Sequence, residues 1–177
     1  MSFLHLDGAA QRIDRLSAAI GRAVAWCLLF MVLGEFALVL MRYVLGVGSI
    51  WLQESVVYAH ASLFMLAAAW TLAADAHVRV DIFYADASPR TKATVDLLGA
   101  LLLLLPFAVT LIYLSLPYVA RSWALLEGSR ETSGLPAVFL LKSLIPLFAA
   151  LIGLQGLAQA IRAVLVVAGG AAAAPAR

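Results

Sequence analysis

The side chains that could carry chemistry in this chain are few, and the histidines come first. His5, His60 and His77 are the only three in 177 residues. A bundle of membrane helices can hold haem between two imidazoles that face each other. Only His60 falls inside a long apolar stretch, so a facing pair is lacking. We interpret His60 as a hydrogen-bonded packing residue.

The motifs of common enzymes do not occur in this sequence. Cys27 is the only cysteine, which excludes a CxxC pair and an intrachain disulfide. Neither HExxH nor GxSxG is present. We therefore predict that the protein is not an enzyme and has no catalytic residue, metal site or cofactor.

Two charged residues lie inside long apolar stretches, where an ionised side chain costs on the order of 3 kcal/mol. Glu35 could be a proton or ion site, or it could pair with a polar group on a neighbouring helix or subunit. A single carboxylate does not make a relay, which favours the pairing. Lys142 lies near one end of its stretch, where its long side chain could reach the surface or meet an acid such as Glu54.

A second group of polar residues flanks the turn between the first two apolar stretches. Arg42 and Glu54 lie on either side of it, and a salt bridge between them is the simplest expectation. Trp51, Glu54, Tyr58 and Met65 follow roughly helical spacing and would share one face. That face could pack within the chain or against a partner.

The sharpest motif is His77-Val-Arg79-Val-Asp81, between the second and third apolar stretches. If this segment is helical, His77 and Asp81 are one turn apart and able to pair. Its apolar residues could enter a membrane interface. By itself it also fits an ordinary amphipathic connector.

The elements that position these residues are four apolar stretches, at 23–41, 55–74, 97–120 and 135–161. Each has about 19 to 27 residues, and roughly 20 apolar residues in a helix cross a ~30 Å hydrocarbon core. Hydrophobic residues make up 64% of the chain and charged residues 12%, and the mean hydropathy is +1.01. The sequence predicts an all-α integral membrane protein with four spans.

The positions of Lys and Arg predict the orientation, because cytoplasmic loops retain positive charge. With the N-terminus inside, eight basic residues flank the inner ends and three the outer ends. The inner ones are Arg12, Arg15, Arg22, Arg79, Arg90, Lys92, Arg162 and Arg177, and the outer ones are Arg42, Arg121 and Arg130. Both termini are therefore predicted to be cytoplasmic. The net charge of +2 is too small and too scattered to suggest a nucleic-acid partner.

Three segments are predicted: an N-terminal segment at 1–22, a four-helix membrane domain at 23–167 and a disordered tail at 168–177. Residues 3–22 show helical spacing of apolar residues, which fits either a short amphipathic helix on the inner surface or an extension of the first span. Gly46 and Gly48 suit a tight outer turn. Ser88 and Pro89 suit the start of the third helix, which must tilt, bend at Pro106 or Pro117, or protrude.

The order of short motifs resembles the small membrane subunit of tripartite ATP-independent periplasmic (TRAP) transporters. The resemblance covers residues 42–162. It rests on Arg42-Tyr43, Trp51-Leu-Gln-Glu54, Ala67-Ala-Ala69, His77-Val-Arg-Val-Asp81, Ser88-Pro-Arg90, Asp96-Leu-Leu-Gly99, Pro117-Tyr118, Ser122-Trp123, Gly134-Leu-Pro136, Leu141-Lys142, Ile145-Pro146 and Leu154-Gln-Gly156.

The resemblance implies a subunit of a transporter in the bacterial inner membrane. In that family a periplasmic solute-binding protein captures an organic acid, and a large membrane subunit moves it with a sodium gradient. The small subunit would act as a scaffold for the large one. The expected interface residues are Arg42, Trp51, Glu54, Tyr58, Glu127, Glu131 and Lys142, with the two outer-loop glutamates as candidates for touching the binding protein. His77, Arg79 and Asp81 would order the inner loop.

Two other functions stay open at this point. One is a membrane anchor for a haem or quinone redox complex, and the other is a self-contained small exporter or channel. The low number of polar residues inside the spans argues against both, because a translocation path needs polar sites near the middle of the membrane.

Overall fold

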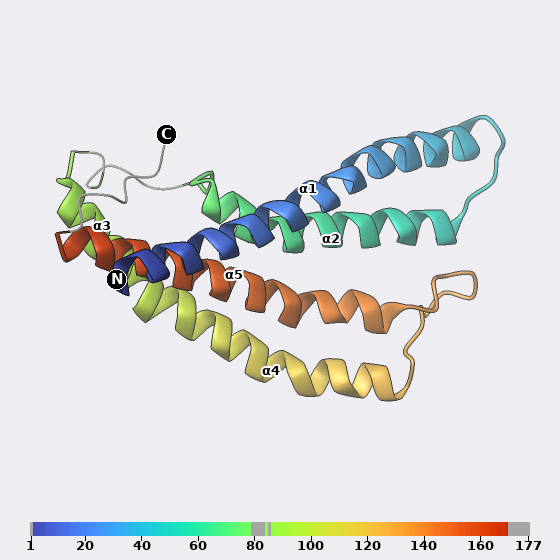
Figure 1. Ribbon diagram of the computed structural model, residues 1–177. Coiled ribbons are helices and arrows are strands. Elements are labelled where there is room, and N and C mark those ends of the chain that lie inside the picture. Colours follow the sequence, from blue (N-terminus) through green and yellow to red (C-terminus); the bar gives the residue numbers. More distant parts are fainter. Residues whose placement is uncertain (1, 79–83, 85, 170–177) are drawn as a thin grey trace.

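The computed structural model describes residues 2–78, 84 and 86–169, and this part of the chain is helical apart from its connections (Figure 1). The elements are α1 (Ser2–Tyr43), α2 (Ile50–Ala73), α3 (Pro89–Gly99), the π-helical segment η1 (Ala100–Leu104), α4 (Leu105–Ala124) and α5 (Val138–Val167). Because α3, η1 and α4 follow one another without a break, they form one long span. Within the described residues, four helices are long and apolar enough to cross a membrane. The predicted all-α fold with four spans is confirmed.

The N-terminal segment differs from the separate amphipathic helix expected over residues 3–22. α1 runs from Ser2 to Tyr43 without interruption, so the structure has the other alternative, an extension of the first span. The sequence reason is that no proline interrupts residues 2–43. Side chains in the first half of α1 also bind α5, as described below, which holds this half against the bundle.

The helices form two hairpins that meet at one end of the molecule (Figure 1). α1 pairs with α2, and α4 pairs with α5; α1 leans away from α5 toward the connecting turns. Small residues let α1 approach α2 closely. A Cβ atom at Gly21 would lie 2.4 Å from the Trp70 ring, and one at Gly34 would lie 2.7 Å from Val56.

Small residues also let α5 approach α4 and η1 closely in the other hairpin. A Cβ atom at Gly153 of α5 would lie 3.2 Å from Ala108 of α4, and one at Gly156 would lie 2.6 Å from Leu104 of η1. α5 is the best covered of the four spans: 28% of its apolar window is buried, against 6% for α1. The core of the bundle is therefore centred on α5.

Turn and cap residues explain where the helices begin. Gly46 has a φ of 68° in the turn between α1 and α2, a conformation that glycine adopts without strain. The Ser49 hydroxyl caps α2 by accepting a hydrogen bond from Leu52 N. As predicted, Ser88 caps α3 in the same way and Pro89 occupies its first turn.

The long third span changes its hydrogen bonding just before a proline. Residues Ala100–Leu104 are π-helical, and Leu105 N donates to Ala100 O. Pro106 has no N–H and its ring crowds the preceding turn, so a locally wider helix relieves the conflict. The sequence predicted that this span tilts, bends at Pro106 or Pro117, or protrudes, and it did not predict the π-helical segment that precedes Pro106.

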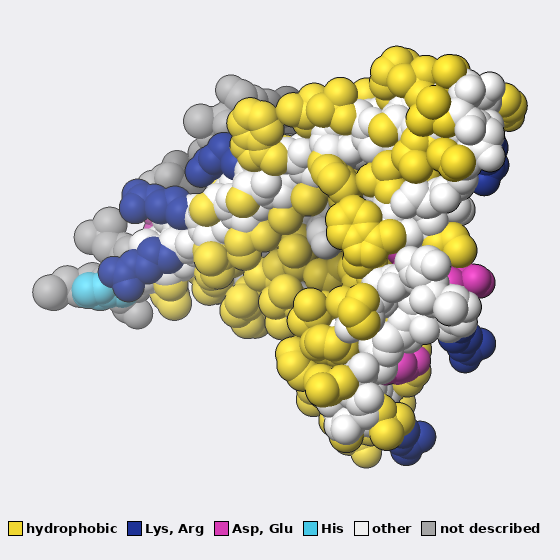
Figure 2. Space-filling model, turned by 90° about the vertical axis from the view of Figure 1, so that its right-hand side faces the viewer, with side chains coloured by type: hydrophobic (Ala, Val, Ile, Leu, Met, Phe, Trp, Pro, Cys, Tyr) yellow, Lys and Arg dark blue, Asp and Glu magenta, His cyan; other side chains and the backbone are white. Residues whose placement is uncertain are grey.

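Most of the visible surface is apolar. Figure 2 looks onto the end that carries the two connecting turns, and hydrophobic side chains cover much of both hairpins, with charged groups toward the edges. On α1, Trp26 is 74% exposed and Phe36 62% exposed. Such a surface requires lipid or another protein around it.

Candidate functional site

Glu54 joins α2 to the loop between α4 and α5. Its carboxylate accepts a hydrogen bond from the Ser129 hydroxyl and a second from Leu135 N at 2.5 Å. Gly134 lies against the same group, since a Cβ there would lie 2.7 Å from Glu54 Oε2. The predicted salt bridge between Glu54 and Arg42 is not formed, and Arg42 is exposed at the end of α1.

Lys142 meets an acid, which was one of its two expected alternatives, and this acid is Glu127 and not Glu54. The Lys142 Nζ lies 2.5 Å from Glu127 Oε2 and 4.1 Å from the centroid of the Tyr118 ring. The Ser122 hydroxyl also donates to Glu127. Leu126 lies in the turn that follows α4 and has a φ of 45°. This turn brings Glu127 back over α5. Hydrogen bonds from Lys142 and then Ser122 lower the pKa of Glu127 below its ordinary value.

The other predicted outer residues are not joined into one cluster. Arg42 and Trp51 are exposed, at the end of α1 and the start of α2. Glu131 is exposed, and its backbone N–H donates to Ser129 Oγ. Tyr58 Oη is buried and has no hydrogen-bond partner in the described part of the chain.

A polar network lies in the half of the bundle where α1 begins and α5 ends, and the sequence did not predict it. Ser17 Oγ donates to Gln155 Oε1 at 2.9 Å, and Gln155 Nε2 donates to Asp14 Oδ1 at 2.8 Å. Arg162 forms a salt bridge with the same Asp14 carboxylate. Gln155 is fully buried, so the network fixes α1 against α5. The available signal was helical spacing, with polar residues at 14 and 17 and at 155, 159 and 162.

The inner-loop motif is only partly described. Arg79 and Asp81 lie outside the described residues, and His77 is exposed. Nearby, Tyr84 Oη donates to Asp96 Oδ2 at 2.7 Å and Lys92 Nζ lies 5.4 Å from the Tyr84 ring centroid. The end of this loop is thereby anchored to α3.

Two ionisable residues face outward at membrane depth. Glu35 is exposed on α1 and forms no hydrogen bond or ion pair within the described chain. His60 is exposed on α2 and stacks on Phe64 with ring centroids 6.4 Å apart. The described residues hold no group of three His, Cys, Asp or Glu side chains that could bind a metal ion.

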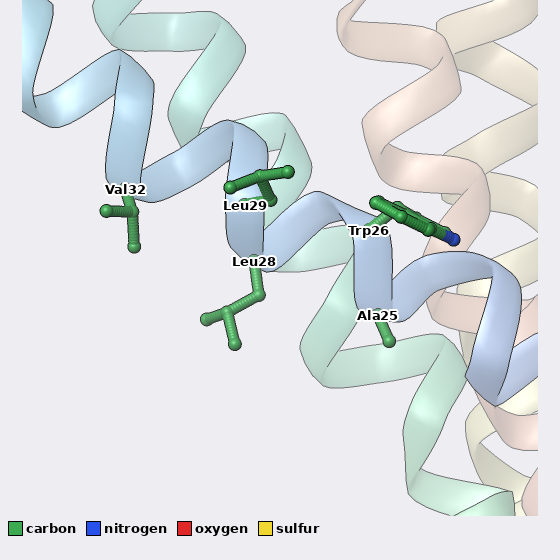
Figure 3. Close-up of a pocket in the computed structure, with 5 residues that line it drawn as sticks. All are labelled: Ala25, Trp26, Leu28, Leu29 and Val32. Carbon is green, nitrogen blue, oxygen red and sulfur yellow. The ribbon is translucent and has the colours of Figure 1, made fainter.

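An open apolar depression lies on the middle of α1 (Figure 3). All five lining residues belong to this helix. Ala25, Leu28 and Val32 project to one side, and Trp26 and Leu29 to another (Figure 3). It is a surface feature of one helix, with no enclosed volume for a small ligand.

The described part of the chain is a helical multi-pass membrane protein. It has four long apolar helices, polar networks near the two ends of the bundle and a bare apolar surface. The family model of the DctQ component of tripartite ATP-independent periplasmic transporters matches residues 15–166. The chain belongs to this family and is a small membrane subunit of a TRAP transporter, a transport component and not an enzyme. No curated protein and no solved structure matches the chain significantly.

Proposed function

We propose that this subunit is a scaffold for the large membrane subunit of its transporter, which imports an organic acid delivered by a periplasmic solute-binding protein and driven by a sodium gradient. The bare surface of the bundle is the observation that supports this role most directly. Only 6% of the apolar window of α1 and 11% of that of α2 are buried within the chain. A helix bundle with so little self-burial has wide faces available for another membrane protein.

The placement of polar groups favours a scaffold over a subunit that itself carries the substrate across the membrane. The hydrogen-bonded clusters around Glu54, Glu127 and Gln155 tie helices and loops together at the ends of the bundle. Glu35 and His60, which are ionisable and lie at membrane depth, are both exposed on the outside of the bundle. Transporters usually place polar substrate sites near the membrane midplane, between broken helices.

The proposed setting is the bacterial inner membrane, with both termini in the cytoplasm. α1 begins and α5 ends at the same end of the bundle (Figure 1). In this orientation the α4–α5 loop faces the periplasm. Glu127 is engaged by Lys142, so it would shape the loop, while the exposed Glu131 would be free to contact the binding protein.

The haem or quinone anchor and the self-contained exporter receive no support from a particular observation. The three histidines lie on different elements: His5 on α1, His60 on α2 and His77 in the inner loop. The family model that matches residues 15–166 describes a transporter component.

Co-purification and uptake test the proposal together. A tagged chain extracted in mild detergent should bring down a large, very hydrophobic subunit in fixed ratio. Vesicles with both membrane subunits and the binding protein should take up an organic acid only when a sodium gradient is imposed, and omission of this chain should abolish uptake. Isolation of the chain alone, or full uptake without it, would refute the scaffold role.

A further inference from the structure

One face of the outer half of α1 repeats at spacings of three and four residues. Its members are Ala25, Leu28, Val32, Glu35, Val39 and Arg42, and all six are exposed. This spacing places side chains along a single seam of a helix, as in packed helix pairs. Figure 3 shows the first three projecting to the same side of α1. We refer to these six residues as the α1 seam.

The same register is already used for packing in the inner half of α1. Asp14 and Ser17 bind Gln155 of α5, and Gly21 lies against Trp70 of α2. Positions 14, 17 and 21 continue the spacing of the seam toward the N-terminus. The inner part of this stripe is therefore covered within the chain, and the outer part is uncovered.

Glu35 indicates what covers the outer part. Along a helix that rises ~1.5 Å per residue, it lies ~10 Å from Arg42 and ~20 Å from Arg22, well inside the apolar span. A carboxylate at this depth faces a protein partner or water, because lipid tails offer no hydrogen bond. Since the described chain supplies no partner, the donor must come from elsewhere.

We propose that the α1 seam is the docking surface for one apolar helix of the large subunit, which carries a hydrogen-bond donor at the depth of Glu35. This proposal rests on the scaffold function proposed above. Leu28, Val32 and Val39 supply the packing contacts, and Glu35 sets the register, as single polar residues do in packed helix pairs.

A second copy of this chain fits the seam poorly. Two copies inserted in the same orientation, related by a two-fold axis along the membrane normal, would bring identical residues together. Glu35 would then face Glu35 and Arg42 would face Arg42, so that like charges meet and neither carboxylate gains a donor. Charge complementarity therefore favours a different chain.

Site-directed photo-crosslinking in native membranes tests the seam in the intact complex. A crosslinking residue is introduced at 28, 32 or 39, and matched control positions at 29, 33 and 36 lie on the neighbouring exposed face of the same helix. Seam positions should form an adduct with the large subunit, and the controls should form little. Adducts only with lipid, adducts with a second copy, or equal yields all round α1 would overturn the proposal.

Substitution of Glu35 tests the donor. Glu35→Leu should reduce the co-purified large subunit roughly three- to twentyfold, the range that one interhelical hydrogen bond supports in membranes. Glu35→Gln keeps an acceptor and should retain more. Thr110→Leu, at an exposed polar position of α4, is the control and should bind normally. Unchanged binding by Glu35→Leu would contradict the role of Glu35.

The two proposals fail in different ways. If the wild-type chain brings down no large subunit, the scaffold function itself is wrong. If the large subunit co-purifies but crosslinks arise from α4 and not from the seam, only the docking surface is wrong.

Discussion

Glu127 and Lys142 show how a loop carboxylate stabilises a lysine that enters a membrane helix. The lysine lies one turn into α5, and its charge meets both the carboxylate and the face of Tyr118. The Ser122 hydroxyl completes the group from α4. These contacts close the α4–α5 hairpin at the end that carries its loop and keep the lysine's charge near the surface.

The lowered pKa of Glu127 predicts a pH dependence. Because folding lowers its pKa below the ordinary value of 4.5, the ionised group stabilises the fold above that value and loses this effect as pH falls through the folded-state pKa. The melting temperature of the purified complex should therefore drop as the pH is lowered below 4.5. Lys142→Met should lessen this drop, and Glu131→Gln should leave it unchanged; equal profiles for wild type and Lys142→Met would contradict the pairing.

Substitution of Glu54 should destabilise the loop between α4 and α5. Glu54→Leu removes both acceptor oxygens, so that the Ser129 hydroxyl and Leu135 N each lose a hydrogen-bond partner. The loop should lose roughly 1–3 kcal/mol of local stability, seen as faster hydrogen exchange at 129–135 in detergent-solubilised protein. Gln53→Glu, on the exposed side of the same turn, should leave exchange unchanged. Normal exchange in Glu54→Leu would mean that the carboxylate does not hold the loop.

At the scale of elements, small residues decide how closely the helices approach. Gly21 faces the rigid Trp70 ring, and any Cβ there would overlap it. Gly8 lies on the same helix with nothing within 4 Å of the position of a Cβ. The two glycines therefore form a matched pair.

Gly21→Val should force α1 away from α2. Overpacking of this kind costs roughly 1–3 kcal/mol, and the variant should melt at a lower temperature with altered tryptophan fluorescence from Trp70. Gly8→Ala should melt as wild type or slightly higher, since alanine favours helix. A normal melting temperature for Gly21→Val would show that the α1–α2 contact is looser than described.

At the scale of the whole molecule, the buried network of Gln155 joins the two hairpins. Gln155→Leu would leave Asp14 and Ser17 with unsatisfied groups, at a cost of roughly 1–3 kcal/mol. Thermal unfolding in detergent should show a clear loss of stability. Gln159→Leu is the control, because Gln159 makes only a long hydrogen bond of 3.4 Å to Leu72 O. Equal stabilities for the two variants would argue against the network.

The orientation of the whole molecule is also testable. With eight basic residues at the inner ends and three at the outer ends, both termini should be cytoplasmic. A C-terminal fusion to alkaline phosphatase, which is active only in the periplasm, should be inactive, while a fusion within 129–133 should be active. The reverse pattern would invert the proposed orientation and move the α4–α5 loop to the cytoplasm.

Sequence alone predicted the membrane spans and the start of α3, because these features depend on composition and local chemistry. Apolar stretches of membrane length identified four spans, and Ser88 with Pro89 identified the start of α3. Each of these follows from a few neighbouring residues, whatever the rest of the fold does.

The partners of polar side chains could not be predicted in the same way. Glu127 and Lys142 are separated by a loop whose path depends on the left-handed conformation of Leu126. Asp14 and Gln155 are close only because α1 continues through the inner half of the bundle and crosses α5. Sequence spacing along one helix does not report which other helix it meets.

The sequence by itself therefore determined that this is a four-span membrane protein, because the hydrophobic effect and helix capping act locally along the chain. Only the tertiary structure decided that Glu54 holds a loop, that Glu127 pairs with Lys142, and that Glu35 has no partner among the described residues. These outcomes depend on which helix faces pack together, and packing brings into contact residues that are far apart in the sequence.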